Sequence, residues 1–161
     1  MKIGVMSDTH GDVAAIRRAV VAAGPVDFWL HGGDYSQDSN FLAEFTGLPV
    51  TAVQGNCDGP TEAKVDEYVD AGPVKIWLTH GHRYSAKGRV AELTWWGSKY
   101  GVQAVIYGHT HIPEISCHQD ILIFNPGSPS RPRGGSKASC GIVEIGTDGT
   151  INARLVEVAK A

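Results

Sequence analysis

A chain of 161 residues can bury one well-filled hydrophobic core and is too short for two ordinary domains. Hydrophobic residues make up 42% and charged residues 19%, a globular composition that excludes a disordered or membrane-spanning chain. The formal charge of −3 gives no general attraction for nucleic acid or acidic lipid. We therefore expect one domain, 1–161, that holds any anionic substrate by a metal or by a few cations.

The first half of the chain alternates strand and helix. Short apolar runs predict three buried strands, at residues 2–6, 26–30 and 48–54. Between them, helical spacing follows Asp12 and stops at Gly24, and a second helix passes through 41–45 and stops at Gly47. This strand and helix order indicates a parallel sheet with helices on its faces.

The second half is expected to build another sheet. Apolar runs predict strands at 67–69, 74–79 and 103–107. Segment 85–101 has apolar residues at helical spacing and ends in Gly, so we expect a helix on which Trp95 and Trp96 pack. Residues 113–125 and 138–158 are typical of hairpins, the latter with the Asp-Gly turn of "TDGT". We expect a second, antiparallel-rich sheet beside the first.

Polar groups able to bind metal follow the predicted strands one after another. They lie in "SDTH", "GGD", "GN", "THGH" and "GHTH", and they are Asp8, His10, Asp34, Asn56, His80, His82, His109 and His111. The loops at the carboxyl ends of strands in an open α/β sheet converge on one crevice, so these groups should meet. Carboxylates, imidazoles and an amide suit borderline divalent ions, and the count exceeds the needs of one ion. A metal pair bridged by a carboxylate is suited to displacement at phosphorus.

The ordered motifs "SDTHGD", "HGGD", "GNCD", "THGH", "GHTH" and "NPGS" resemble those of the calcineurin-like metallophosphoesterase superfamily. The resemblance runs from Met1 to about Ser128 and is greatest to the small phosphodiesterases of the YfcE and MJ0936 type. It implies an α/β (α+β) fold in which two mixed β-sheets pack as a sandwich flanked by helices. It also implies an enzyme, a phosphodiesterase that hydrolyses ester bonds with the help of metal ions.

The same resemblance implies a dinuclear metal centre and its ligands. One ion would be held by Asp8, His10 and His111, the other by Asn56, His80 and His109, with Asp34 as the bridge. A metal-bridging hydroxide is then the nucleophile. The expected catalytic residues are Asp34, Asn56, Cys57 and His80. Mn²⁺ is our first choice for the two divalent ions, with Fe²⁺, Zn²⁺ and Ni²⁺ as alternatives of overlapping ligand preference.

Cys57 stands where many metallophosphoesterases carry a His that is thought to protonate the leaving group. As a nucleophile, the thiol would need an activating base or a depressed pKa. As a metal ligand, it would duplicate Asn56, which already fills that position in the motif. A neutral thiol is a weak donor without the positive charge of an imidazolium. We therefore expect good leaving groups to be cleaved well and alkyl phosphates poorly. Asp58 either orients neighbouring groups or stabilises a turn.

Other polar residues near the motifs allow two interpretations. His31 is expected to be buried and hydrogen-bonded behind the ligands, whereas His82 either orients a ligand or faces solvent. Arg131 and Arg133 either grip a phosphate or lie in a solvated loop or an oligomer contact. His118 lies in a predicted hairpin away from the motifs, and we assign it no role.

Three widely spaced cysteines without a CxxC pair give neither a disulfide framework nor a zinc knuckle. The start of the chain reads as a first strand, and no apolar run reaches the length of a bilayer span. We therefore expect a cytoplasmic protein that binds a small phosphodiester substrate. We expect it to bind neither a membrane nor a nucleic acid. The sequence specifies neither the natural substrate nor whether the protein forms a homo-oligomer.

Two other functions compete with the phosphodiesterase. The fold resembles that of the retromer subunit Vps29, a protein-interaction scaffold with a degraded metal site. A complete ligand set disfavours that scaffold here, because nothing in a scaffold requires seven metal-binding groups. A phosphomonoesterase is the other alternative, although the protein phosphatases that the core resembles are longer chains.

Overall fold

The computed structural model describes residues 1–161, which form two five-stranded mixed sheets and three helices. The first sheet contains β1 (Lys2–Met6), β2 (Phe28–His31), β3 (Val50–Ala52), β9 (Ser139–Ile145) and β10 (Ile151–Glu157). Its strands lie in the order β10-β9-β1-β2-β3. The three strands β1, β2 and β3 run parallel, as predicted, while β9 is antiparallel to both of its neighbours.

The second sheet is formed by the middle of the chain. It contains β4 (Asp66–Ala71), β5 (Val74–Thr79), β6 (Ala104–Ile106), β7 (Glu114–His118) and β8 (Ile121–Asn125). Its strands lie in the order β4-β5-β6-β8-β7. The central strands β5, β6 and β8 are parallel, and the edge strands β4 and β7 are antiparallel to their neighbours.

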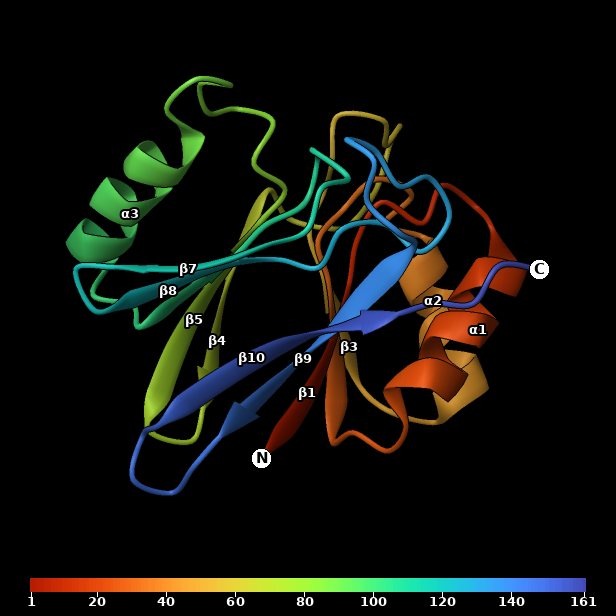
Figure 1. Cartoon of the computed structure of the whole chain (residues 1–161), viewed down its shortest axis with the longest axis horizontal. Coiled ribbons are helices and arrows are strands. Elements are labelled where there is room, and N and C mark those ends of the chain that lie inside the picture. Colours follow the sequence, from red (N-terminus) through yellow and green to blue (C-terminus); the bar gives the residue numbers. More distant parts are fainter.

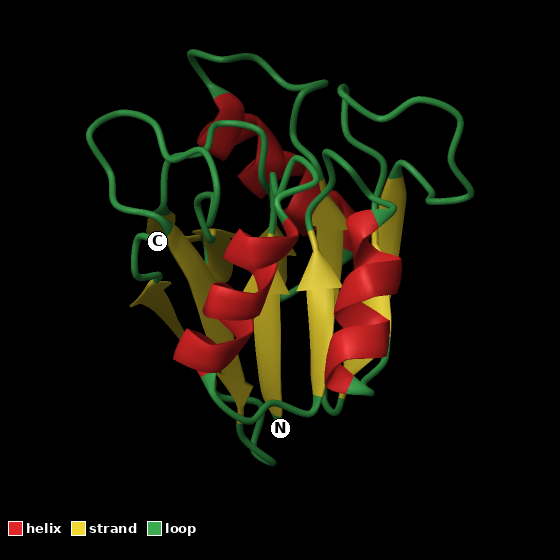
Figure 2. Cartoon of the chain, turned by 90° about the vertical axis from the view of Figure 1, so that its right-hand side faces the viewer, coloured by secondary structure: helices red, strands yellow, loops and turns green.

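The two sheets pack face to face between layers of helix (Figure 1). Helices α1 (Val13–Ala23) and α2 (Asp38–Thr46) cover the outer face of the first sheet, where Figure 2 shows them in front, and α3 (Arg89–Tyr100) covers the second. Apolar side chains between the sheets form the largest core cluster, among them Ile3, Leu30, Ile76 and Phe124. Each such fully buried side chain contributes roughly 2 kcal/mol. The predicted sandwich flanked by helices is confirmed.

Helix α1 shows why these elements form where they do. The Asp12 carboxylate accepts a hydrogen bond of 2.9 Å from the Ala15 N–H, and the chain turns at Gly24, whose φ is 71°. Ala15, Ile16, Ala19 and Ala23 form the buried face against the first sheet. Both predicted ends of this helix are confirmed.

The predicted arrangement of the second sheet was wrong in two respects. Hairpin β9–β10 joins the first sheet, because β9 pairs with β1 in the register Ile3 to Val143. The second sheet is also not dominated by antiparallel pairs, since β5, β6 and β8 are parallel. Strand patterns specify which residues face a core, but they do not specify the neighbour of each strand when the partner lies far along the chain.

Several predicted element boundaries were also too wide. The third strand begins at Val50 because Pro49 has no N–H to donate to a sheet. The third helix begins at Arg89, after Gly88 at its N-cap, rather than at residue 85. Trp96 packs against the apolar cluster under this helix, as expected, whereas Trp95 is 53% exposed.

The carboxyl ends of the parallel strands point to one end of the molecule, where Figure 2 shows the longer loops gathered above the sheets. The loops after β1, β2 and β3 carry the first three motifs, and those after β5, β6 and β8 carry the others. No helix is long and apolar enough to cross a membrane. The packing of two sheets therefore brings six motif loops to a common surface.

Candidate metal centre

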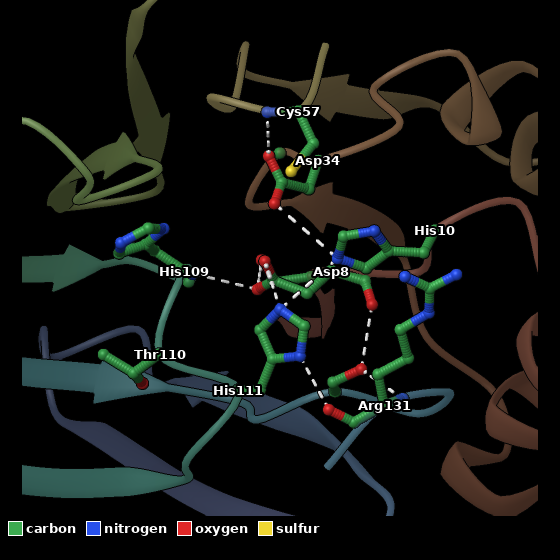
Figure 3. Close-up of polar contacts among 12 residues, drawn as sticks. Asp8, His10, Asp34, Cys57, His109, Thr110, His111 and Arg131 are labelled. Carbon is green, nitrogen blue, oxygen red and sulfur yellow. Dashed lines mark hydrogen bonds and ion pairs between the residues drawn. The ribbon is translucent and has the colours of Figure 1, made fainter. Parts of the chain in front are cut away.

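The first group of ligands converges closely (Figure 3). Asp8, His10, Asp34 and His111 offer ligand atoms that all lie within 4.8 Å of one another. His111 Nε2 is 3.3 Å from Asp8 Oδ1 and 3.3 Å from His10 Nε2. Asp34 Oδ2 lies 3.6 Å from His10 Nε2. Four groups that follow three different strands thus surround one small volume.

A second group lies on the other side of Asp34. Asn56 Oδ1 is 3.1 Å from His80 Nε2 and 3.0 Å from His109 Nδ1. His80 Nε2 is also 3.3 Å from Asp34 Oδ1. The two carboxylate oxygens of Asp34 therefore face different groups of ligands, which is the geometry expected of a bridge. The structure brings together all seven residues that the sequence analysis named as ligands.

Backbone carbonyls orient two of the imidazoles. His80 Nδ1 lies 2.6 Å from the carbonyl oxygen of Gly32, and His111 Nδ1 lies 2.6 Å from that of Arg131. A carbonyl can only accept, so both Nδ1 atoms carry the proton and donate. Both Nε2 atoms are then free to bind a metal through their lone pairs, and both point at carboxylate oxygens.

Asp8 tests whether these residues fit a metal ion. Its Oδ2 accepts hydrogen bonds from the Ser7 hydroxyl at 2.6 Å and from the His109 N–H at 2.9 Å. Its Oδ1 is buried and has no hydrogen-bond donor, although it lies 3.3 Å from His111 Nε2. A buried carboxylate oxygen without a donor is costly unless a cation satisfies it. The residues present therefore fit a divalent metal ion.

The charges of the site shift the pKa values of its members. Burial tends to raise the pKa of Asp34, but hydrogen bonding and charge from His80, with the Cys57 N–H, hold it well below its ordinary value. Burial tends to lower the pKa of His80, but Asp34 and Asp8 raise it above its ordinary value. These carboxylates therefore attract a cation to this point. Burial, with the charges of His80 and Arg89, lowers the pKa of His109 to about 4, so its ring is neutral.

The backbone of the motif loops adopts a conformation that sequence reasoning did not anticipate. Five of the predicted ligands have positive φ values between 49° and 68°: Asp8, His10, Asp34, His109 and His111. Such a conformation is strained for a residue with a Cβ and persists only where the surroundings enforce it. The same loops are closely packed, since a Cβ on Gly108 would collide with Ser7 and a Cβ on Gly55 would collide with Asp34. Glycine is therefore needed at these two positions.

Residues that the sequence analysis did not single out support the loops. The Ser128 hydroxyl donates to the Asp8 carbonyl at 2.8 Å, and the Ser130 hydroxyl donates to the Thr9 carbonyl at 3.0 Å. Asp38 accepts from the Thr9 hydroxyl at 2.5 Å and from the Gly11 N–H at 2.9 Å. The motif "NPGS" marked the position of Ser128 but not its partner, and nothing in the sequence connected Asp38 with the first loop.

Cys57 lies at the mouth of the site and is exposed. Its backbone N–H donates to Asp34 Oδ1 at 2.9 Å, and the Asn56 amide lies 3.6 Å from its sulfur. Partial burial, followed by hydrogen bonding and charge from Asp34, raises the pKa of the thiol. A neutral thiol is a poor nucleophile, so these shifts agree with the expectation that Cys57 attacks nothing.

Asp58 both stabilises its own turn and orients a neighbouring loop, the two roles considered for it from the sequence. Its Oδ2 accepts from the Gly55 N–H at 2.8 Å within its own turn. Its Oδ1 accepts from the Ser36 N–H at 2.7 Å in the loop that carries Asp34. Together with the bond from the Cys57 N–H to Asp34, this joins the loops after β2 and β3.

The other polar residues singled out in the sequence lie at different distances from the ligands. His31 is fully buried, as expected, with Nε2 2.9 Å from the Thr9 hydroxyl. The ring of His82 lies 5.3 Å from that of His80, so this residue is close to the site rather than remote from it. Arg131 is exposed and extends beside His10 in Figure 3, whereas no side-chain contact joins Arg133 to the ligands.

Comparisons with known proteins agree with this geometry. The family model described as the calcineurin-like phosphoesterase superfamily domain matches residues 1–148. Phosphodiesterase MJ0936 of Methanocaldococcus jannaschii is 35% identical over 146 residues, which cover 79% of this chain and 83% of that protein. A predicted phosphoesterase from Streptococcus pneumoniae has a crystal structure with a TM-score of 0.81 and 31% identity, covering 98% of this chain and 92% of the other.

Another solved structure shares the fold at lower identity. The crystal structure of a single mutant of Vps29 from Entamoeba histolytica has a TM-score of 0.77 and 22% identity, covering 99% of this chain and 100% of the other. This similarity concerns the fold alone. The family match spans nearly the whole chain and includes all of the ligand motifs. The chain therefore belongs to the calcineurin-like phosphoesterase superfamily, a family of metal-dependent hydrolases, as the motifs predicted.

Proposed function

We propose that this protein is a phosphodiesterase with a dinuclear metal centre. The observation that carries the proposal is the arrangement of acceptors around Asp34. One of its oxygens faces His10 and the other faces His80, while Asp8 Oδ1 is buried without a donor. Two divalent cations would satisfy these acceptors. Within the protein, Asp34 Oδ1 accepts from the Cys57 N–H, but no hydrogen bond satisfies Asp8 Oδ1.

The ligand roles follow from this arrangement. Asp8, His10 and His111 would hold one ion, Asn56, His80 and His109 the other, and Asp34 would bridge them. When bound, the ions supply a nucleophile by lowering the pKa of a shared water molecule, and they offset charge on the phosphoryl oxygens. The chain's own residues hold the ions, orient the imidazoles and keep the two sides at a constant separation.

The metal and the compartment complete the proposal. Mn²⁺ is our first choice, because the ligand group combines hard carboxylate oxygens with imidazole nitrogens and contains no cysteine. All three cysteines are free, and two of them, Cys57 and Cys117, are exposed. Exposed free thiols persist in a reducing compartment, which supports the cytoplasm.

The test compares hydrolysis of bis-p-nitrophenyl phosphate with that of p-nitrophenyl phosphate. The protein is first chelated, and Mn²⁺, Fe²⁺, Zn²⁺ or Ni²⁺ is then restored singly. We expect turnover that requires a metal and favours the diester. Asp34→Asn should lose this turnover, whereas Asp70→Asn, which removes the same charge at an exposed position on β4, should keep it.

The alternatives give different results in the same assay. Preference for the monoester would indicate a phosphomonoesterase. No turnover with any of the four metals would favour a protein-interaction scaffold like Vps29. Metal-dependent turnover that survives Asp34→Asn would contradict the bridging role of this carboxylate.

A further inference from the structure

A groove lies between α3 and the edge strand β7, near the loops of the metal centre. Figure 1 shows β7 beneath α3. The volume of the groove is about 630 Å³, within the range of pockets that hold small organic ligands. We call it the α3–β7 groove. The lining residues used below are Lys87, Arg89, Ala91, Tyr107, Thr110 and Glu114.

Two residues that line the α3–β7 groove connect it to the loops of the metal centre. Thr110 lines it and lies between the proposed ligands His109 and His111, on the loop drawn in Figure 3. Arg89 also lines it and donates from Nε to the carbonyl oxygen of Gly81 at 3.0 Å, one residue after His80. The groove therefore borders the loops that carry His80, His109 and His111.

The charges lining the groove favour an anion. The lysine and arginine side chains that form ion pairs are Lys64, Arg83 and Lys137. Lys87 and Arg89 are not among them, so neither has a carboxylate partner. The one carboxylate of the groove is already hydrogen-bonded, since Glu114 accepts from the Tyr107 and Ser116 hydroxyls, each at 3.0 Å. In a chain of net charge −3, this wall is locally positive.

We propose that the α3–β7 groove binds one ester group of the phosphodiester substrate and favours substrates in which that group carries a second anion, a phosphate or a carboxylate. The inference rests on the proposed function, because it concerns the substrate of the same site. The groove is large enough for a sugar or a nucleoside between the two charges. Lys87, at the exposed rim, would meet the second anion, and Arg89 would lie nearer the phosphodiester.

The test uses two esters that differ by one phosphate. They are thymidine 5′-(p-nitrophenyl phosphate) and the same compound with a 3′-phosphate, which have the same leaving group and scissile bond. At low ionic strength we expect the 3′-phosphorylated ester to have a KM about fivefold lower, as one partly exposed charge pair provides, with similar kcat. High salt should reduce this difference.

Variants of α3 and the loop before it locate the effect. Lys87→Glu should abolish the KM difference between the two esters, and Ala91→Trp, at an exposed position within the groove, should raise KM for both. Lys99→Glu makes the same charge change on α3 outside the groove, where Lys99 lies over Trp95, and should leave the difference intact.

Equal KM values for the two esters with the unmodified protein would overturn the inference. So would a loss of the difference in Lys99→Glu as large as that in Lys87→Glu. Bis-p-nitrophenyl phosphate, assayed beside them, separates this failure from that of the proposed function. If it is hydrolysed without discrimination between the thymidine esters, only the groove is wrong; if no diester is hydrolysed, both proposals fail.

Discussion

Cys57 is the residue at which this site departs from the histidine that the family resemblance leads one to expect. Its thiol is neutral, because burial and the neighbouring Asp34 raise its pKa. It therefore offers the leaving group a weak donor without a positive charge. Departure of an alkoxide needs a proton, whereas departure of a nitrophenolate does not.

Replacing Cys57 with His should help poor leaving groups more than good ones. We expect Cys57→His to raise kcat/KM for an alkyl phosphodiester by about a hundredfold, which is the lower end of what general acid catalysis contributes. The change for bis-p-nitrophenyl phosphate should be small. The measurement is kcat/KM for a series of diesters of graded leaving-group pKa, and an equal gain across the series would refute the role of this position.

Most ligands of the centre could be predicted from sequence because each follows a strand, within a short motif. The partners that hold them could not, because they come from distant segments. Ser128 is close to Asp8 only when β8 and β1, which belong to different sheets, are packed together. The left-handed backbone of His10 likewise follows from packing and has no sequence signal of its own.

At the scale of elements, the site depends on joining loops that follow different strands. Asp58 provides one such joint, because its two oxygens accept from Gly55 after β3 and from Ser36 after β2. Hydrogen bonds to a charged group contribute more than neutral ones. The Asp34 and Asn56 sides of the centre should therefore separate if this carboxylate is removed.

We expect Asp58→Asn to lower the free energy of unfolding by about 2 kcal/mol, because the amide can accept only one of the two bonds. It should also weaken Mn²⁺ binding by about tenfold, the lower range for residues that orient metal ligands. Urea unfolding and calorimetric titration measure the two effects. Asp70→Asn, exposed on β4, is the matched control. Unchanged Mn²⁺ affinity in a folded Asp58→Asn protein would show that the joint does not position the ligands.

The order of strands and helices could largely be read from the sequence, since each element has its own periodicity and end signals. Helix α1 is an example, with its cap at Asp12 and its stop at Gly24. The assignment of hairpin β9–β10 to the first sheet could not be read in this way. It depends on pairing between residues about 140 positions apart, such as Ile3 with Val143, which no local pattern encodes.

At the scale of the whole molecule, buried histidines link stability to pH. Burial is the main cause that lowers the pKa values of His10, His31, His82 and His109. Below about pH 6.5 the unfolded chain binds protons that these folded histidines do not bind, so stability falls as the pH falls. His80 acts in the opposite sense, because its raised pKa adds stability at low pH that is lost as the pH rises.

For the chelated protein we therefore expect the urea midpoint to fall between about pH 7.5 and about pH 5.5, since four histidines outweigh one. His31→Gln should show a smaller fall than the unmodified protein, because His31 is fully buried. His118→Gln, at an exposed position on β7, should show the same fall. A midpoint that is constant or rises over this range would contradict the linkage.

The measurement that tests the central claim most directly is anomalous diffraction at the manganese edge from crystals of the Mn²⁺-loaded protein. The account predicts two peaks per chain, about 3.5 to 4 Å apart, on either side of the Asp34 carboxylate. One peak should lie among Asp8, His10 and His111, and the other among Asn56, His80 and His109. A single peak, or two peaks that do not share Asp34, would contradict the dinuclear centre.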